Sequence, residues 1–172
     1  MKSVIARRHF GTIACLFITL VFAGCGKDDV YKRRHTFPQS VWNRIEEGKS
    51  VFFEDVKIKN IDDPYHIYVS FRYTPQVNVD RMQFIMRITS PSGTEKETIH
   101  SFPLKNREGK FIGEEVGEYF EIEERCKVFQ FFNEPGDYKI EILNFMHKYT
   151  VSGMISMGLR IEKAEMDYDI ED

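Results

Sequence analysis

The chain has 172 residues, with 24 Lys and Arg against 27 Asp and Glu, which gives a net charge of −3 at neutral pH. A chain of this size buries about two-thirds of its unfolded surface, so it needs no disulfides or metals to hold one folded domain. The acidic balance disfavours nucleic acid, and we expect no nucleic-acid partner.

Residues 1–24 have the pattern of a bacterial lipoprotein signal peptide. Three basic residues precede an apolar stretch from Ile13 to Ala23, which is shorter than the roughly 20 residues needed to span a bilayer. Ala23 and Gly24 stand directly before Cys25, and small residues there admit the backbone to the signal peptidase. We therefore predict that Cys25 carries an N-acyl and an S-diacylglycerol lipid. The alternatives are an unusual membrane helix, or an ordinary signal peptide followed by a chance cysteine.

Removal of residues 1–24 makes the mature chain more acidic. Those residues hold three basic side chains and no acidic ones, so 21 Lys and Arg remain against 27 Asp and Glu, a net charge of −6. Attachment to the membrane would therefore depend on the acyl chains rather than on anionic lipid. Cys126 is the other cysteine of the mature chain, so no intramolecular disulfide is expected, and we interpret Cys126 as a small buried hydrophobic residue.

Residues 25–37 are polar and charged, with little apolar periodicity, and we predict a lipidated N-terminus followed by a flexible tether. Lys27, Asp28 and Asp29 resemble a short signal that routes lipoproteins to the outer face of the outer membrane in some bacteria. A solvated charged linker would have the same composition.

Residues 38–163 show the alternation of apolar and polar side chains that is typical of half-buried strands. The clear runs are 65–73, 82–88, 138–142 and 155–161, and the weaker ones are 51–58, 95–102, 119–122 and 127–132. Turn-forming residues separate these runs at short intervals. The pattern predicts an all-β fold, an antiparallel and jelly-roll-like β-sandwich of about eight strands.

One short helix is expected within this domain, over residues 40–47. Ser40 would cap its first turn, Trp42 and Ile45 would share one face, and Gly48 would stop it. Residues 164–172 form an acidic tail that fits a solvated terminus. Calcium ligands are the alternative for the four carboxylates near its end: Asp167, Asp169, Glu171 and Asp172.

The sequence shows no catalytic constellation and no metal-site spacing, so we expect a protein that is not an enzyme and needs no metal or other cofactor. Six glutamates cluster between Glu114 and Glu124, where alternation places Glu121 and Glu123 on one outward face. Aromatic residues not needed for the core are candidates for a ligand or partner surface. They are Tyr31, Trp42, Tyr68 and Tyr149.

A set of landmarks occurs in a fixed order along the chain. In the C-terminal half they are the segments 132–142, 151–154 and 157–163, with Met146 between the first two. Earlier ones are Cys25, Phe37-Pro38 followed by Trp42, the run 65–73, Pro91-Ser92-Gly93 and the segment 109–113. With these residues the chain resembles the GldH-type gliding-motility lipoproteins over nearly its whole mature length.

This resemblance implies a small, non-catalytic envelope lipoprotein that is accessory to the machinery of gliding motility and its associated protein secretion. Its partners would be the membrane, through the lipid on Cys25, and other envelope proteins of that machinery. We predict a lipid-anchored location in the cell envelope, at the outer membrane, with the periplasmic or cell-surface face left open. The family occurs in bacteria that do not glide, so membership does not establish motility.

Two rival functions share some of these features. A lipid-anchored carbohydrate-binding module would show a row of exposed, coplanar aromatic rings. A hydrolase would need carboxylates that converge in a cleft.

Overall fold

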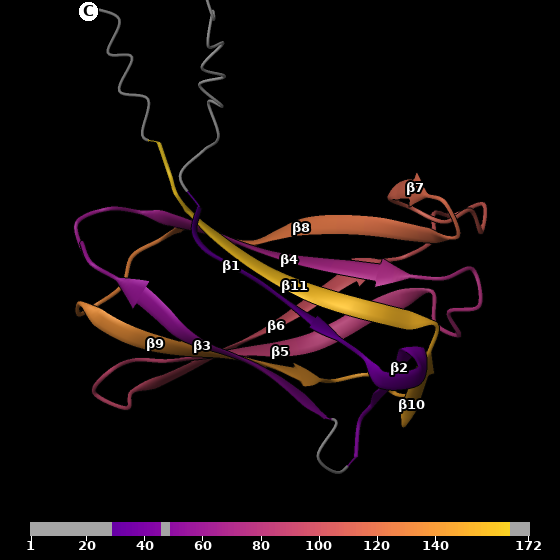
Figure 1. Cartoon of the computed structure of the whole chain (residues 1–172), viewed down its shortest axis with the longest axis horizontal. Coiled ribbons are helices and arrows are strands. Elements are labelled where there is room, and N and C mark those ends of the chain that lie inside the picture. Colours follow the sequence, from indigo (N-terminus) through magenta and orange to yellow (C-terminus); the bar gives the residue numbers. More distant parts are fainter. Residues whose placement is uncertain (1–28, 46–48, 166–172) are drawn as a thin grey trace, which may run out of the picture.

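The computed structural model describes residues 29–45 and 49–165, which form an antiparallel β-sandwich (Figure 1). The all-β prediction is confirmed, since every regular element described is a strand apart from one 3-10 turn. The elements are β1 (Asp29–Thr36), η1 (Pro38–Ser40), β2 (Val41–Asn43), β3 (Ser50–Ile58), β4 (Tyr65–Tyr73), β5 (Arg81–Thr89), β6 (Glu95–Pro103), β7 (Glu114–Val116), β8 (Tyr119–Gln130), β9 (Gly136–Asn144), β10 (Thr150–Ser152) and β11 (Met154–Lys163).

The long strands pair in nested order. β1 pairs with β11, β3 with β9, β4 with β8, and β5 with β6. The chain thus folds back on itself at the turn 90–94 as a double-stranded ribbon. Rolling of this ribbon adds the pairs β4–β11 and β5–β9. The result is a five-stranded sheet, β1-β11-β4-β8-β7, facing a four-stranded sheet, β3-β9-β5-β6, in the jelly-roll arrangement.

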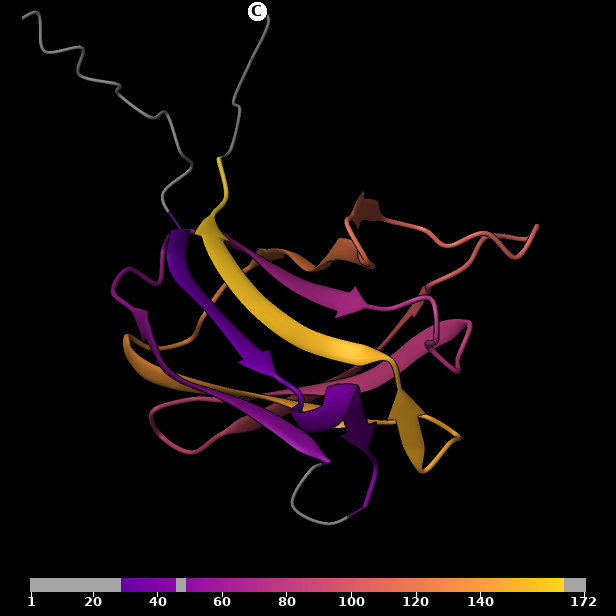
Figure 2. The same cartoon turned by 45° about the vertical axis from the view of Figure 1, so that its right-hand side comes forward.

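The sandwich has two ends, and the chain enters and leaves at one of them (Figures 1 and 2). Asp29 at the start of β1 pairs with Glu162 near the end of β11. We call this end the proximal end; it also contains loop 59–64, turn 90–94 and loop 131–135. The opposite end, the distal end, contains η1, β2, β10 and the loops 74–80, 104–113 and 145–149.

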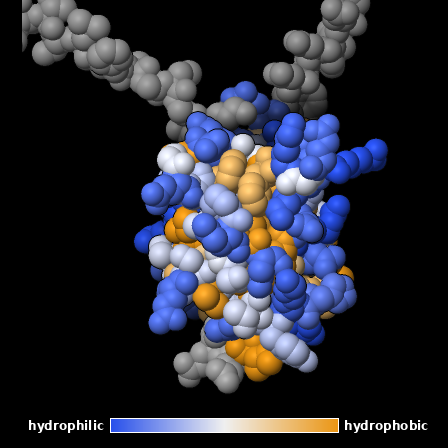
Figure 3. All heavy atoms as spheres, turned by 90° about the vertical axis from the view of Figure 1, so that its right-hand side faces the viewer, coloured by the Kyte–Doolittle hydropathy of each residue, from blue (hydrophilic) through white to orange (hydrophobic). Residues whose placement is uncertain are grey.

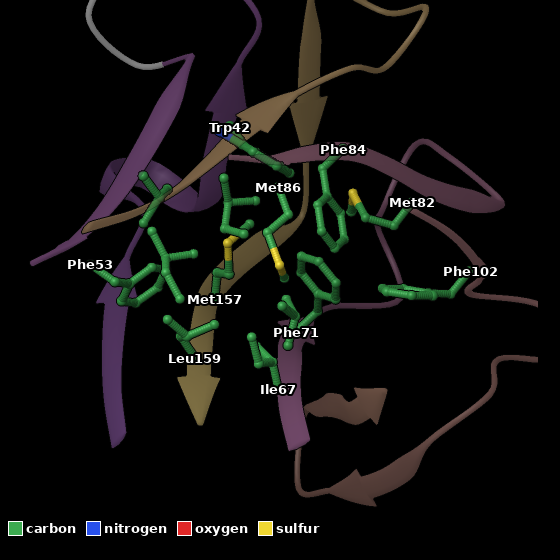
Figure 4. Close-up of a cluster of buried hydrophobic side chains, with 14 of the residues drawn as sticks. Trp42, Phe53, Ile67, Phe71, Met82, Phe84, Met86, Phe102, Met157 and Leu159 are labelled. Carbon is green, nitrogen blue, oxygen red and sulfur yellow. The ribbon is translucent and has the colours of Figure 1, made fainter. Parts of the chain in front are cut away.

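The core fills the space between the two sheets (Figure 4). Phe71 of β4 faces Phe84 of β5, with ring centroids 5.8 Å apart, and Phe102 of β6 packs against both rings. These are the inward positions that the alternation predicts, and complete burial of such a side chain contributes about 1.5–3 kcal/mol. Trp42 is fully buried at the distal end, stacked on Phe37 at 5.4 Å.

The predicted helix over 40–47 is wrong. Ser40 ends the 3-10 turn η1, and Val41–Asn43 form the strand β2, which pairs with β10. Residues 46–48 lie outside the described residues. The helical spacing of Trp42 and Ile45 was misleading because Trp42 alone is buried, whereas Ile45 is exposed.

The predicted tether over 25–37 is also wrong for residues 29–36, which form the edge strand β1. Only Tyr31 of this strand is buried, so the strand lacks the apolar alternation by which strands are recognised. Its backbone nevertheless pairs with β11 from Asp29 to Thr36, with one bulge next to Asp29. At the other terminus Ala164, assigned to the acidic tail, is buried, and its N–H donates to the carbonyl of Pro64 at 2.8 Å. Asp167, Asp169, Glu171 and Asp172 lie outside the described residues.

Candidate functional site

The predicted lipidation site stands very close to the folded domain in sequence. Cys25, Lys27 and Asp28 lie outside the described residues, whereas Asp29 is the first residue of β1. The carboxylate of Asp29 lies 3.4 Å from the guanidinium of Arg160 and 3.6 Å from the ammonium group of Lys32. The last residue of the predicted export signal is therefore part of the sandwich.

The outer surface of the five-stranded sheet is polar across four strands, and we call it the polar face. Strand alternation turns the apolar side chains of these strands into the core and leaves the polar ones outside. The polar face consists of Lys32 and Arg34 on β1, His66, Tyr68, Ser70 and Arg72 on β4, Glu121, Glu123 and Arg125 on β8, and Ser156, Gly158, Arg160 and Glu162 on β11.

Arg34 crosses the polar face from the edge strand to the fourth strand. One of its terminal nitrogens donates to Ser70 on β4 at 3.2 Å and to Glu121 on β8 at 2.6 Å. The side chain of Arg34 passes over Gly158 on β11. A β-carbon at this position would lie 2.5 Å from the hydroxyl oxygen of Ser70, so the absence of a side chain leaves room for these contacts. Arg72 also binds Glu121, with Nε at 2.9 Å from the carboxylate. The carboxylate of Glu121 thus ties three strands together, β1, β4 and β8.

These arginines change the ionisation of Glu121. Partial burial opposes its charge, but the hydrogen bond from Arg72 and the charges of Arg34 and Arg72 outweigh that effect and lower the pKa of Glu121. A glycosidase acid needs the opposite shift, a carboxyl group whose pKa is raised. Glu121 is therefore suited to holding arginines rather than to donating a proton.

A second network surrounds Arg160 on the same face. Its guanidinium contacts Glu123 at 2.6 Å and Glu162 at 2.5 Å, and it lies 3.9 Å from the ring centroid of Tyr68. The hydroxyl of Tyr68 donates to Glu162 at 2.7 Å, and the pKa of Tyr68 is raised by burial and by this hydrogen bond. The pKa of Arg160 is raised, mainly by the hydrogen bond to Glu123, so Arg160 stays positively charged.

The candidate aromatic residues are not brought together. Trp42 is fully buried and Tyr31 lies in the core, with its hydroxyl bound to the carbonyl of Glu54 at 3.1 Å. Tyr68 is buried beneath Arg160, with Arg125 at 5.3 Å from its ring. Tyr149 is 66% exposed, but it lies in a loop at the distal end. These four residues therefore form no row of exposed rings on one face.

Groups with metal or nucleophilic chemistry are dispersed over the part of the chain that the structure describes. Within residues 29–45 and 49–165 no three His, Cys, Asp or Glu side chains are grouped as metal ligands. Cys126 packs against the core, and burial raises the pKa of its thiol to about 12. The thiol is thus protonated at neutral pH and is a poor nucleophile.

The arginine networks were missed by the sequence analysis, although the outward direction of Glu121 and Glu123 was predicted correctly. Arg34, Arg72 and Arg160 come from strands far apart in the chain, and their meeting depends on sheet order and register. A weak signal existed for Arg72 and Arg160, which are outward residues of clearly alternating strands, because opposite charges on neighbouring strands stabilise each other.

The distal end offers a different surface. Figure 3 looks onto this end, where hydrophobic side chains are interspersed among hydrophilic ones. Ile45, Phe145 and Tyr149 are its exposed large hydrophobic residues outside the short strands. No helix among the described residues is long and apolar enough to cross a membrane.

The fold and the site together define a β-sandwich protein with a network of ion pairs on one sheet face and a predicted lipid-attachment cysteine close to its first strand. The model of the GldH lipoprotein family matches residues 29–161, from the first residue of β1 almost to the end of β11, and the chain belongs to this family. As a lipoprotein of this family it is a membrane-anchored protein of the cell envelope.

A curated relative extends the match over the N-terminal region. The gliding motility lipoprotein GldH homolog of Christiangramia forsetii is 23% identical over 168 residues, which cover 92% of this chain and 99% of the relative. No solved structure matches the chain.

Proposed function

We propose that this protein is a non-catalytic accessory component of the gliding-motility machinery and its associated protein secretion, anchored by lipid on Cys25 in the outer membrane. The observation that carries the proposal is the family match, which covers the whole sandwich and begins where β1 begins. The name of the relative from Christiangramia forsetii, a gliding motility lipoprotein GldH homolog, agrees with a role in gliding motility.

The polar face is the surface that we propose contacts other envelope proteins. Arginine and tyrosine are enriched among the residues that contribute most to protein interfaces. Arg34, Arg72 and Arg160 are already held by carboxylates, so they lose little side-chain entropy when a partner binds. Fixed charges of both signs on this face favour a partner with a complementary polar surface rather than a small apolar ligand.

The lipid anchor is tested by metabolic labelling with palmitate. We expect Cys25→Ala to abolish incorporation because it removes the sulfur that carries the diacylglycerol. Cys126→Ala is the matched control, since it removes the other cysteine of the mature chain, whose thiol is packed against the core. Label that persists in Cys25→Ala would show that the anchor is assigned to the wrong residue.

The partner surface is tested by photo-crosslinking in intact cells. A photoreactive residue at Lys32 probes the polar face, and one at Lys57 probes the outer surface of the four-stranded sheet. The two lysine side chains are similarly exposed, at 70% and 66%. We expect position 32 to capture motility or secretion proteins and position 57 to capture few. Equal capture at both positions would contradict the role of the polar face, and glycan binding without protein capture would favour the carbohydrate-binding alternative.

A further inference from the structure

The proximal end carries a group of exposed apolar side chains, which we call the proximal apolar group. It consists of Val30, Ile61, Val128, Phe129 and Phe131, all of them large hydrophobic residues with more than a third of their surface in solvent. They come from the start of β1, loop 59–64, the end of β8 and the start of loop 131–135. Segments distant in the sequence thus place apolar surface at the end where the chain enters.

Phe129 is held outward in an unfavourable backbone conformation. Its φ of +49° lies in the left-handed region that bulky residues rarely adopt. In this conformation its N–H donates to Nδ1 of His66 at 3.3 Å, and its ring meets the ring of His66 at 5.0 Å. About half of the Phe129 side chain still lies in solvent. Core packing does not explain such a residue, and backbone strain of this kind is concentrated at functional sites.

Covalent geometry brings the proximal end close to the lipid. Cys25 and Asp29 are four residues apart, and four fully extended residues reach at most about 14 Å. The headgroup region of one leaflet is about 5–8 Å thick. With its acyl chains in the bilayer, Cys25 therefore confines the start of β1 to the membrane surface.

We propose that the proximal apolar group inserts into the headgroup boundary of the membrane that holds Cys25. The sandwich then stands on the bilayer with its distal end pointing away. This inference rests on the proposed lipid anchor. Aromatic and branched side chains are stabilised at this boundary because their apolar parts leave water. Charges near the group are mixed, as in the Lys163–Asp63 pair at 2.8 Å, so the affinity comes from apolar insertion rather than from attraction to anionic lipid.

Tryptophan fluorescence in vesicles tests this orientation. The full acylated chain is reconstituted in vesicles of phosphatidylethanolamine and phosphatidylglycerol whose acyl chains are brominated near the headgroups, because bromine quenches nearby tryptophan. Phe131→Trp places the probe at the proximal end, and Phe145→Trp is the matched control at the distal end. The two phenylalanines are 49% and 45% exposed. The native Trp42 is buried at the distal end and provides the background.

We expect the brominated vesicles to remove most of the emission added by Phe131→Trp and to leave that of Phe145→Trp unchanged. Phe129→Trp gives a second proximal position, and circular dichroism verifies the fold of each variant. The mass of each intact protein reports its acylation. Absence of acyl chains would overturn the lipid anchor and this inference together. An acylated protein in which the tryptophan at position 131 is quenched no more than that at position 145 would overturn the inference alone.

Discussion

Gly153 lies between β10 and β11 with a φ of +79°, in the left-handed region that favours glycine. A β-carbon at this position would lie 2.6 Å from the backbone nitrogen of Val77 and 2.7 Å from its α-carbon. Backbone atoms cannot turn aside as a side chain can. Gly153 therefore lets loop 74–80 pack against the connection from β10 to β11, where the carbonyl of Gly153 accepts a hydrogen bond from the N–H of Thr74 at 2.8 Å.

We expect Gly153→Ala to lower the free energy of unfolding by about 2–4 kcal/mol, from backbone strain together with steric overlap. Gly93→Ala is the matched control, because Gly93 has a similar φ of +87° but no atom within 4 Å of the added carbon. Gly93→Ala should lower the free energy of unfolding by only about 1 kcal/mol. Urea denaturation measures both values, and equal costs would show that the contact with Val77 is unimportant.

Glu121 makes the stability depend on pH. Its pKa in the folded protein is lowered, so its contribution is complete above the unfolded value of about 4.3 and is lost as the pH falls through the folded value. We expect Glu121→Gln to lower the free energy of unfolding by about 1 kcal/mol at neutral pH, since Arg34 and Arg72 lose a charged partner that is only partly shielded from solvent. At about pH 3 the difference from the native chain should shrink.

Glu108→Gln is the control for this pH series. Glu108 pairs with Lys110 at 3.1 Å, but both side chains are largely exposed, and such pairs contribute little. Denaturation at the two pH values should show almost no change for this variant. If Glu121→Gln lowers the free energy of unfolding equally at both pH values, the charge of Glu121 is not the cause of its stabilising effect.

The edge strand β1 extends the folded domain to residue 29, nine residues before its predicted start at residue 38. It covers the edge of β11 and contributes Tyr31 to the core. A chain that starts at Phe37 would lose this strand, whereas one that starts at Asp28 would keep it.

We expect the chain starting at Phe37 to be less stable than the one starting at Asp28 by about 3 kcal/mol or more, because it loses the burial of Tyr31 and the hydrogen bonds to β11. The bare edge of β11 should also promote self-association. Urea denaturation and size-exclusion chromatography test both effects. Equal stability of the two chains would restore the tether assignment for residues 29–36.

The elements that the sequence predicts well are those with one apolar and one mostly polar face. β4, β5, β9 and β11 alternate clearly because each turns a continuous row of apolar side chains into the core. β1 was missed because it is an edge strand with one inward side chain. The sequence predicts two strands where β8 is one, because the stretch from Glu123 to Arg125 has no apolar alternation. The backbone of β8 nevertheless pairs with β4 on both sides of this stretch, so it forms a single strand.

For the candidate site, the sequence was sufficient for local features only. The motif around Cys25 is contiguous, and the outward direction of Glu121 and Glu123 follows from strand alternation. The contact of Arg34 with Ser156 joins residues 122 positions apart and requires the nested strand order. Such a partner cannot be inferred from periodicity, because periodicity gives the face of a side chain and not its neighbour across the sheet.

Nested pairing makes the first strand of the sandwich depend on the last one. Among the described strands β1 pairs only with β11, so the five-stranded sheet is complete only when the C-terminal part of the chain is available. Pairing over such long separations costs loop-closure entropy before it is rewarded. The polar face, which needs β1, β11, β4 and β8 together, is therefore a property of the finished domain and of no smaller part of it.

The antiparallel placement of β1 beside β11 also decides how the protein bears mechanical force. A pull between the membrane and the distal end draws β1 along its own axis. The hydrogen bonds to β11 are perpendicular to the strands, so they are all stretched at once in shear. A pull between the two chain termini peels the same strands apart one bond at a time. We expect single-molecule pulling to give a higher unfolding force with attachment points at positions 25 and 149 than at positions 25 and 165, and equal forces would contradict this. β1 is thus oriented to resist a pull that comes from the lipid anchor proposed at Cys25.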